Sequence, residues 1–271
     1  MGLIHADATA LTIIQGSSDG VQPKYYDSSN NYWYKQNRYG YEDKSESLAS
    51  LVLQFSNITK YVIYEPCLID DIPGCCSKNF LTSGESFISF QRLYELAGSG
   101  CSLYDAIRSL DTCSERIDYV HDFLLDTIGF DCSEYLSQVL SLDALILNTD
   151  RHFNNLGIII NNETGNCKAA PIFDNGAALL SSYKDFPADT PFQDCLDKLV
   201  AHPFSTNFIE QATEAGWTLK LDYIGIKNRL LFEPSSRAVD VLYYQLEQLK
   251  DFIPQLEYPE IPFINYTLSS D

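Results

Sequence analysis

Leu147-Asn148-Thr149-Asp150-Arg151-His152-Phe153-Asn154-Asn155-Leu156 is a polar segment that directly follows a strongly apolar one. The apolar stretch, residues 135–147, predicts a buried helix. Beyond the polar segment, apolar runs at 156–160 and 169–173 flank a turn and predict a β-hairpin that ends just before Asp174. A helix end and a hairpin would therefore hold several polar side chains on one local scaffold.

Three of these side chains fit the chemistry of phosphoryl transfer. That reaction needs a carboxylate to orient the attacking hydroxyl and one or two protein oxygens to hold Mg²⁺. Asp150 and Asn155 lie five residues apart, and Asp174 follows the hairpin. Each motif alone is more often structural, since Asp-Asn-Gly is a common turn sequence. Their combination predicts Asp150 as the base, with Asn155 and Asp174 as metal ligands.

The N-terminal part of the chain alternates short apolar runs with turn signals. This pattern predicts strands, then one helix from Glu42, another strand, and a loop-rich connection. The predicted strands are 10–14, 23–26, 32–36 and 61–64, and the loop-rich connection is 66–84.

After about residue 85 the spacing of apolar residues is mainly helical. The clearest helices are predicted at 103–110, 117–128 and 135–147, and residues 206–252 are predicted helical again with Ser235 as an N-cap. The fold class is therefore α+β, with a strand-rich N-terminal lobe at 1–80 and a helix-rich C-terminal lobe at 81–271.

Composition narrows the possible partners. The chain has 271 residues and a net charge of -19, which repels DNA, RNA and anionic membranes. We therefore expect no direct nucleic-acid or membrane partner, although solubility alone accounts for much of the charge. The eight cysteines form no CxxC pair, and no signal peptide or membrane span is found, so we expect reduced thiols and a cytoplasmic location.

Residues 148–155 together with 171–174 resemble the HipA-like serine/threonine kinases, which are related to the phosphatidylinositol 3- and 4-kinases. The catalytic loop of that family reads Asn-x-Asp-Arg-His-x-x-Asn, and its metal site reads Pro-x-Phe/Tyr-Asp. The resemblance implies a bilobal kinase fold, ATP and Mg²⁺ as cofactors, and a protein substrate. It implies Asp150 as catalytic base and Asn155 and Asp174 as the residues that hold magnesium.

The N-terminal half extends the same resemblance. Ser18-Asp19-Gly20-Val21-Gln22-Pro23-Lys24 is similar to the loop that covers the ATP phosphates in this family, which implies Gly20 and Lys24 as nucleotide contacts. Lys35 corresponds to the strand lysine on the phosphates, and Glu46 to the glutamate that pairs with it. Glu42 is the competing choice for that glutamate.

The roles of several other residues near these motifs are less specific. Arg151 is predicted to offset negative charge around Asp150 and the phosphates, or else to hold the loop in place, and His152 is predicted to be structural. Ser17 and Ser18 are candidates for autophosphorylation or simple turn residues. His202, like the other histidines outside the motif, is interpreted as unrelated to the site.

The resemblance covers residues 15–180 in order, and it has limits. HipA has a further N-terminal subdomain, which we expect to be absent here, so its antitoxin and operator contacts are not carried over. Residues 76–80 are expected near the crossing between the lobes. The alternatives are a phosphoinositide or small-molecule kinase, and a pseudokinase that binds nucleotide without transferring phosphate.

Overall fold

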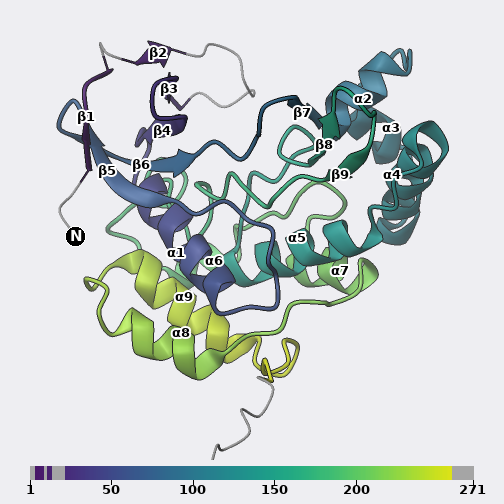
Figure 1. Ribbon diagram of the computed structural model, residues 1–271. Helices are drawn as coiled ribbons and strands as arrows, with labels where there is room; N and C mark the ends of the chain where they lie inside the picture. The colour runs from purple at the N-terminus through teal and green to yellow at the C-terminus, as the bar shows by residue number, and fades with distance from the viewer. Residues whose placement is uncertain (1–3, 9–10, 14–21, 258–271) are drawn as a thin grey trace, which may run out of the picture.

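The computed structural model describes residues 4–8, 11–13 and 22–257. It has a mixed α+β architecture, in which a strand-rich N-terminal part lies beside a mainly helical C-terminal part (Figure 1). None of the helices in the described part of the chain is long and apolar enough to cross a membrane.

The N-terminal part contains a six-stranded sheet in the order β1-β5-β6-β4-β3-β2. Only β1 and β5 run parallel; the other neighbours are antiparallel. The strands are β1 (Ile4–Ala6), β2 (Thr12–Ile13), β3 (Lys24–Asp27), β4 (Tyr32–Gln36), β5 (Glu65–Ile69) and β6 (Ile72–Lys78). The predicted hairpin of strands 23–26 and 32–36 is confirmed by β3 and β4.

Two predictions for this part are wrong. Residues 61–64 form no strand; Tyr61 makes only an isolated bridge to Ile172, and the run is apolar because Val62 and Tyr64 are buried. Residues 66–84, predicted as loop-rich, contain most of the β5–β6 hairpin. Gly74 suggests a loop in the sequence, but in the structure it lies inside β6. A Cβ at this position would overlap the carbonyl oxygen of Lys35, so glycine allows β4 and β6 to approach closely.

The predicted helix is α1 (Glu42–Gln54). Its apolar residues are buried, including Leu48 and Val52, and they belong to the same large hydrophobic core as the C-terminal helices. Several polar residues of α1 are buried as well, among them Ser45 and Glu46. The helix therefore joins the sheet to the rest of the molecule.

The C-terminal part consists of helices and a three-stranded sheet in the order β7-β8-β9. Its elements are β7 (Glu85–Ser89), α2 (Phe90–Leu96), α3 (Leu103–Arg108), α4 (Cys113–Ile128), α5 (Ser133–Ile146), β8 (Gly157–Asn161), β9 (Cys167–Ala169), α6 (Gln193–Leu196), α7 (Phe208–Glu214), α8 (Tyr223–Leu230) and α9 (Arg237–Gln248). The predicted helices at 103–110, 117–128 and 135–147 are confirmed, and the last is almost wholly buried.

Three details differ from the sequence prediction. The sequence does not predict strand β7, because β7 continues into α2 without a turn between them. The second hairpin strand is Cys167–Ala169, so Asp174 lies beyond the strand rather than at its end. Helix α9 has Ser236, not Ser235, as its N-cap. The predicted lobe boundary at residues 80 and 81 falls in the connection between β6 and β7 and remains a prediction.

Candidate active site

A buried cluster of charges lies between the sheet and the helical part. Lys35 on β4 places its Nζ 2.7 Å from Oε1 of Glu46 on α1 and 2.6 Å from Oδ1 of Asp174. Burial lowers the pKa of Lys35, but Asp174 and Glu46 outweigh it, so this pKa lies well above the ordinary lysine value. Burial raises the pKa of Glu46, and Lys35 opposes that rise. One cation therefore bridges two carboxylates from distant parts of the chain.

A second lysine reaches the same carboxylate. Lys24 and Lys35 face each other across β3 and β4, and Nζ of Lys24 lies 3.4 Å from Oδ2 of Asp174. Burial would raise the pKa of Asp174, but Lys35 and Lys24 hold it well below the ordinary aspartate value. The backbone of Asp174 has φ +62°, a conformation that costs energy in a non-glycine residue and recurs at functional sites. The fold thus aims this carboxylate at both lysines.

The choice between Glu46 and Glu42 is decided by their contacts. The carboxylate of Glu42 accepts hydrogen bonds from the backbone N–H groups of Arg38, Tyr39 and Gly40, at 2.6–3.3 Å. It therefore caps the turn before α1, and Glu46 is the residue that pairs with Lys35. Glu46 also accepts from the backbone N–H of Asn175 at 2.8 Å.

The carboxylate of Asp143 on α5 holds the loop that follows this helix. This carboxylate is fully buried and accepts from Nε and Nη2 of Arg151, each at 2.8 Å, and from Nδ2 of Asn148 at 3.2 Å. Arg151 also donates to the carbonyl of Phe173 at 2.8 Å and to Oδ1 of Asn175 at 2.7 Å. Arg151 therefore ties the 148–155 loop to the segment that follows β9.

These contacts contradict the predicted contact of Arg151 with a nucleotide, although its charge still opposes the rise that loss of hydration causes in the pKa of Asp150. The side chain of Arg151 is fully buried and its donors are engaged inside the protein, so the guanidinium does not reach a nucleotide. The carboxylate of Asp143 neutralises it, which is why the residue can be buried at all. Arg151 holds the loop, as its alternative interpretation has it.

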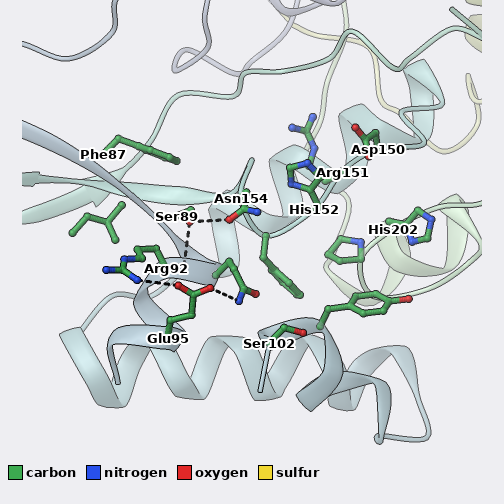
Figure 2. A pocket seen from close by; sticks show the side chains of 15 residues that line it. Phe87, Ser89, Arg92, Glu95, Ser102, Asp150, Arg151, His152, Asn154 and His202 are labelled. Atoms are coloured by element: carbon green, nitrogen blue, oxygen red, sulfur yellow. Dashed lines mark hydrogen bonds and ion pairs between the residues drawn. The ribbon is translucent and has the colours of Figure 1, made fainter. Parts of the chain in front are cut away.

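Asp150, next to Arg151, is instead exposed and lines a groove of about 760 Å³. Figure 2 shows Asp150 and His152 along one side of the groove and Arg92 on α2 along the other. Although Asp150 is open to the groove, the surrounding protein removes part of its hydration and raises its pKa, while His152 acts in the opposite direction.

His202 also lines this groove, and the interpretation that it is unrelated to the site is wrong. Burial lowers the pKa of His202, which favours the neutral imidazole, and the charge of Asp150 opposes that shift. The neighbouring Phe204 packs edge-on against Phe153 of the loop, with ring centroids 5.6 Å apart. Sequence spacing gave no signal for this residue, because the contact joins segments about fifty positions apart.

Asn155 has the features of a metal ligand. The residue is 3% exposed, and its Oδ1 is buried without a hydrogen-bond partner within the described residues. A buried carbonyl oxygen left unpaired is costly, and a cation would satisfy it. Asn155 and Asp174 share a hollow of about 430 Å³ with Asp150. No group of three His, Cys, Asp or Glu side chains in the described part of the chain could hold a metal alone.

Asn155 and Asp174 together are too few ligands to hold a metal ion alone, but they suit a Mg²⁺ ion that also binds a phosphate. Mg²⁺ is commonly held by one or two protein oxygens together with phosphate oxygens of the substrate. An amide oxygen and a carboxylate are the ligand types it prefers. The residues present therefore fit a magnesium ion that arrives with a phosphate ligand.

A smaller cavity, of about 220 Å³, lies next to the charge cluster and has a mostly apolar lining. Lys35, Lys24 and Asp174 line one part of it, and Ser77 to Leu81, at the end of β6 and beyond, line another. Three aromatic rings pack on one another at this cavity, with centroids 5.4–5.9 Å apart: Phe80, Phe87 and Phe173. Residues 76–80 thus lie at the crossing where they were expected. A flat heterocycle attached to phosphates fits such a cavity.

The segment after Asp174 is fastened to the start of α1. The hydroxyl of Tyr41 donates to the carbonyl oxygens of Leu179 and Leu180, both at 2.8 Å, and the hydroxyl of Ser45 donates to Ala178 at 2.8 Å. Leu179 and Leu180 have φ +54° and +60°. Strained residues of this kind persist only where surrounding contacts enforce them. The positions of Glu46 and Asp174 are therefore coupled through a buried set of hydrogen bonds.

Part of the predicted phosphate loop cannot be placed. Gly20, Ser17 and Ser18 lie outside the described residues. Their predicted roles, as a phosphate contact and as autophosphorylation sites, stay predictions.

The six-stranded sheet and α1 lie on one side of the charge cluster, and the 148–155 loop and the β8–β9 hairpin lie on the other. The predicted α+β, bilobal kinase-like fold is confirmed by a likeness to the crystal structure of a Helicobacter pylori proinflammatory kinase, CtkA. The TM-score is 0.61 at 16% identity, over 92% of this chain and 95% of that one.

The chain thus has the fold of that kinase. It also matches HipA in the HipA, HipB and operator DNA complex of Shewanella oneidensis MR-1, with a TM-score of 0.48 and 13% identity, over 91% of this chain and 68% of that one. No protein-family model matches the chain, and no curated protein sequence matches it.

Proposed function

We propose that this chain is an ATP- and Mg²⁺-dependent protein serine/threonine kinase of the HipA-like type. The observation that carries the proposal is the buried cluster in which Lys35 contacts both Glu46 and Asp174, with the unpaired oxygen of Asn155 in the adjoining hollow. Each group of this cluster has a use in phosphoryl transfer, whereas a buried ion pair is weak evidence for a role in stability.

The residues divide the work as follows. Lys24 and Lys35 would hold nucleotide phosphates, and Asn155 and Asp174 would hold Mg²⁺. When bound, the ion supplies neutralisation of charge on the phosphate oxygens. Asp150 accepts a hydrogen bond from a serine or threonine hydroxyl in the 760 Å³ groove and orients it for in-line attack.

The raised pKa of Asp150 supports its role as the proton acceptor. Acid–base catalysis is most efficient when the pKa of the catalytic group moves toward the working pH, and the shift here is in that direction. The protein substrate, the cytoplasmic location and the lack of nucleic-acid or membrane partners belong to the same proposal, and the net charge of -19 supports the last of these.

The test is transfer of labelled γ-phosphate from ATP to protein, lipid and small-molecule acceptors. Wild type is compared with Asp150→Asn, Asp174→Asn and the matched control Asp126→Asn, which makes the same change at an exposed position on α4. We expect both active-site variants to lose transfer by at least about a hundredfold, and Asp126→Asn to retain it.

Three outcomes would contradict parts of the proposal. Equal transfer by wild type and Asp150→Asn would remove the assignment as a kinase with this base. Label in lipid or a small molecule, but not in protein, would replace the substrate class. Nucleotide binding that ignores both Mg²⁺ and the Asp174→Asn change would remove the metal assignment.

A further inference from the structure

A second hollow, of about 440 Å³, adjoins the nucleotide-sized cavity and plays no part in the proposed reaction. The two share Val62, Lys78, Asn79 and Phe80 as lining residues. The second hollow is otherwise formed by residues 59–63, before β5, and by the end of the β8–β9 hairpin. It therefore lies against the same connection between sheet and helices that bounds the nucleotide cavity.

The charge of this hollow is opposite to that of the protein. Lys60, Lys78 and Lys168 line it, in a chain with 18 basic and 37 acidic residues. Lys168 pairs with Glu85 at 2.6 Å, whereas Lys60 and Lys78 are exposed and form no ion pair with any described residue. Single exposed lysines are ordinary on a protein surface. Two unpaired ones around one hollow, in so acidic a chain, make a local site for an anion.

The floor between these lysines is apolar. Ile63 is 52% exposed there, beside Val62, Ile159 and Pro171. Free phosphate would gain nothing from such a floor, whereas an apolar side chain would be buried on it at about 25 cal/mol per Å² of area removed from water. The ligand that fits is an anion with an apolar group next to it.

A further hollow, of about 300 Å³, continues this one, with Lys60 and Lys168 lining both. At its far end it is lined by Asp131 and Glu134, at the start of α5. The two hollows thus form one trough that is basic at the end near Lys78 and acidic at the end near Glu134. Such polarity favours an extended ligand with a fixed direction.

We propose that this trough, the Lys60–Lys78 trough, binds an extended segment of a partner protein that carries an acidic residue, an apolar anchor, a second acidic residue and a basic residue, in that spatial order. The acidic residues would lie on Lys60 and Lys78, the anchor on Ile63, and the basic residue near Glu134. A membrane or a nucleic-acid strand is a poorer fit, since both are polyanions and would meet the acidic end and a protein of net charge -19.

Because four residues line both the trough and the nucleotide cavity, a segment in the trough contacts the wall of the ATP site. Binding at two sites that share structural elements is reciprocal: if the segment changes the affinity for nucleotide, nucleotide changes the affinity for the segment by the same factor. The trough would thus serve both to recruit a partner and to report that binding to the active site.

The test is fluorescence anisotropy with a short labelled peptide in which acidic residues flank a phenylalanine and an arginine follows. A peptide of the same composition in scrambled order is the control for direction. We expect the ordered peptide to bind wild type, and the Lys60→Glu/Lys78→Glu variant to bind it at least about tenfold more weakly, because like charges would then face each other. The matched variant Lys44→Glu/Lys198→Glu, with the same change in net charge at exposed positions elsewhere, should bind as wild type does.

Several results would overturn the proposal. These are no binding of either peptide, equal loss in both double variants, or equal binding of the ordered and scrambled peptides. Binding of phosphatidylserine vesicles or of duplex DNA through Lys60 and Lys78, in place of peptide, would also overturn it. These measurements need no phosphate transfer, so their failure is separate from any failure of the kinase assignment.

Discussion

Asp143 offers the sharpest test of how the catalytic loop is held. Asp143→Asn keeps the shape of the side chain but removes the charge that neutralises the fully buried guanidinium of Arg151. Breaking a buried ion pair at one partner costs about 3–5 kcal/mol, because the other charge is left uncompensated. Native domains are stable by only about 5–15 kcal/mol, so this loss is a large fraction of the total.

The assay is urea unfolding followed by circular dichroism. With about 2–3 kcal/mol per molar urea for the slope, the midpoint of Asp143→Asn should fall by roughly 1–2.5 M. Asp126→Asn, at an exposed position, should leave the midpoint unchanged. Added salt should leave the difference between wild type and Asp143→Asn almost unchanged, since a buried pair is little screened.

A double variant separates the charge pair from general damage to the core. Asp143→Leu/Arg151→Met removes both charges, and we expect it to be more stable than Asp143→Asn, because no lone charge remains buried. A fall of less than about 1 kcal/mol for Asp143→Asn, or a double variant less stable than the single one, would refute the reasoning.

Three further predictions concern the contacts around the cleft. Tyr41→Phe leaves two buried carbonyl oxygens without their shared donor and should lower the free energy of unfolding by about 1–3 kcal/mol in urea unfolding; a change near zero would mean that this hydroxyl is replaceable. Gly40→Ala should lower the Tm by several degrees, because the added Cβ would overlap the carbonyl oxygen of Ser181, whereas Gly100→Ala, where nothing lies within 4 Å, should not lower it. Partial loss of hydration raises the folded-state pKa of Asp150, so folding favours its protonated form, and that contribution is lost as the pH rises through this pKa. Asp150→Asn should therefore have a higher Tm than wild type at about pH 8, with the gap closing toward about pH 3, and a gap independent of pH would contradict this.

The sequence was informative where the signal is local. The helix ending at Leu147, the polar loop after it and the β8–β9 hairpin could be predicted because periodicity and turn residues act over a few positions. The hairpin of β5 and β6 could not, since its proline and glycine residues indicate loops unless the neighbouring strand is known. Gly74 fits there only because β4 passes close by.

The candidate site shows the same division. The pattern of the 148–155 loop predicts Asp150 and Asn155 as site residues, but it does not predict Asp143 as the partner of Arg151. A carboxylate at position 143, inside an otherwise apolar helix, was a usable signal, because a buried charge needs a partner. Tyr41 and His202 gave no such signal, since their contacts depend on segments brought together only by the fold.

Helix α1 has a consequence for how the molecule can come apart. It follows a strand of the sheet along the chain, yet its apolar side lies in one continuous core with Tyr135, Leu136 and Val241 of the C-terminal helices. A chain cut between β6 and β7 would separate this helix from these core residues. We therefore expect neither half to fold alone, and we expect α1 to unfold together with the C-terminal helices that share its core. In hydrogen exchange, the amides of α1 would open together with those of α5 and α9, while the outer strands of the sheet open earlier.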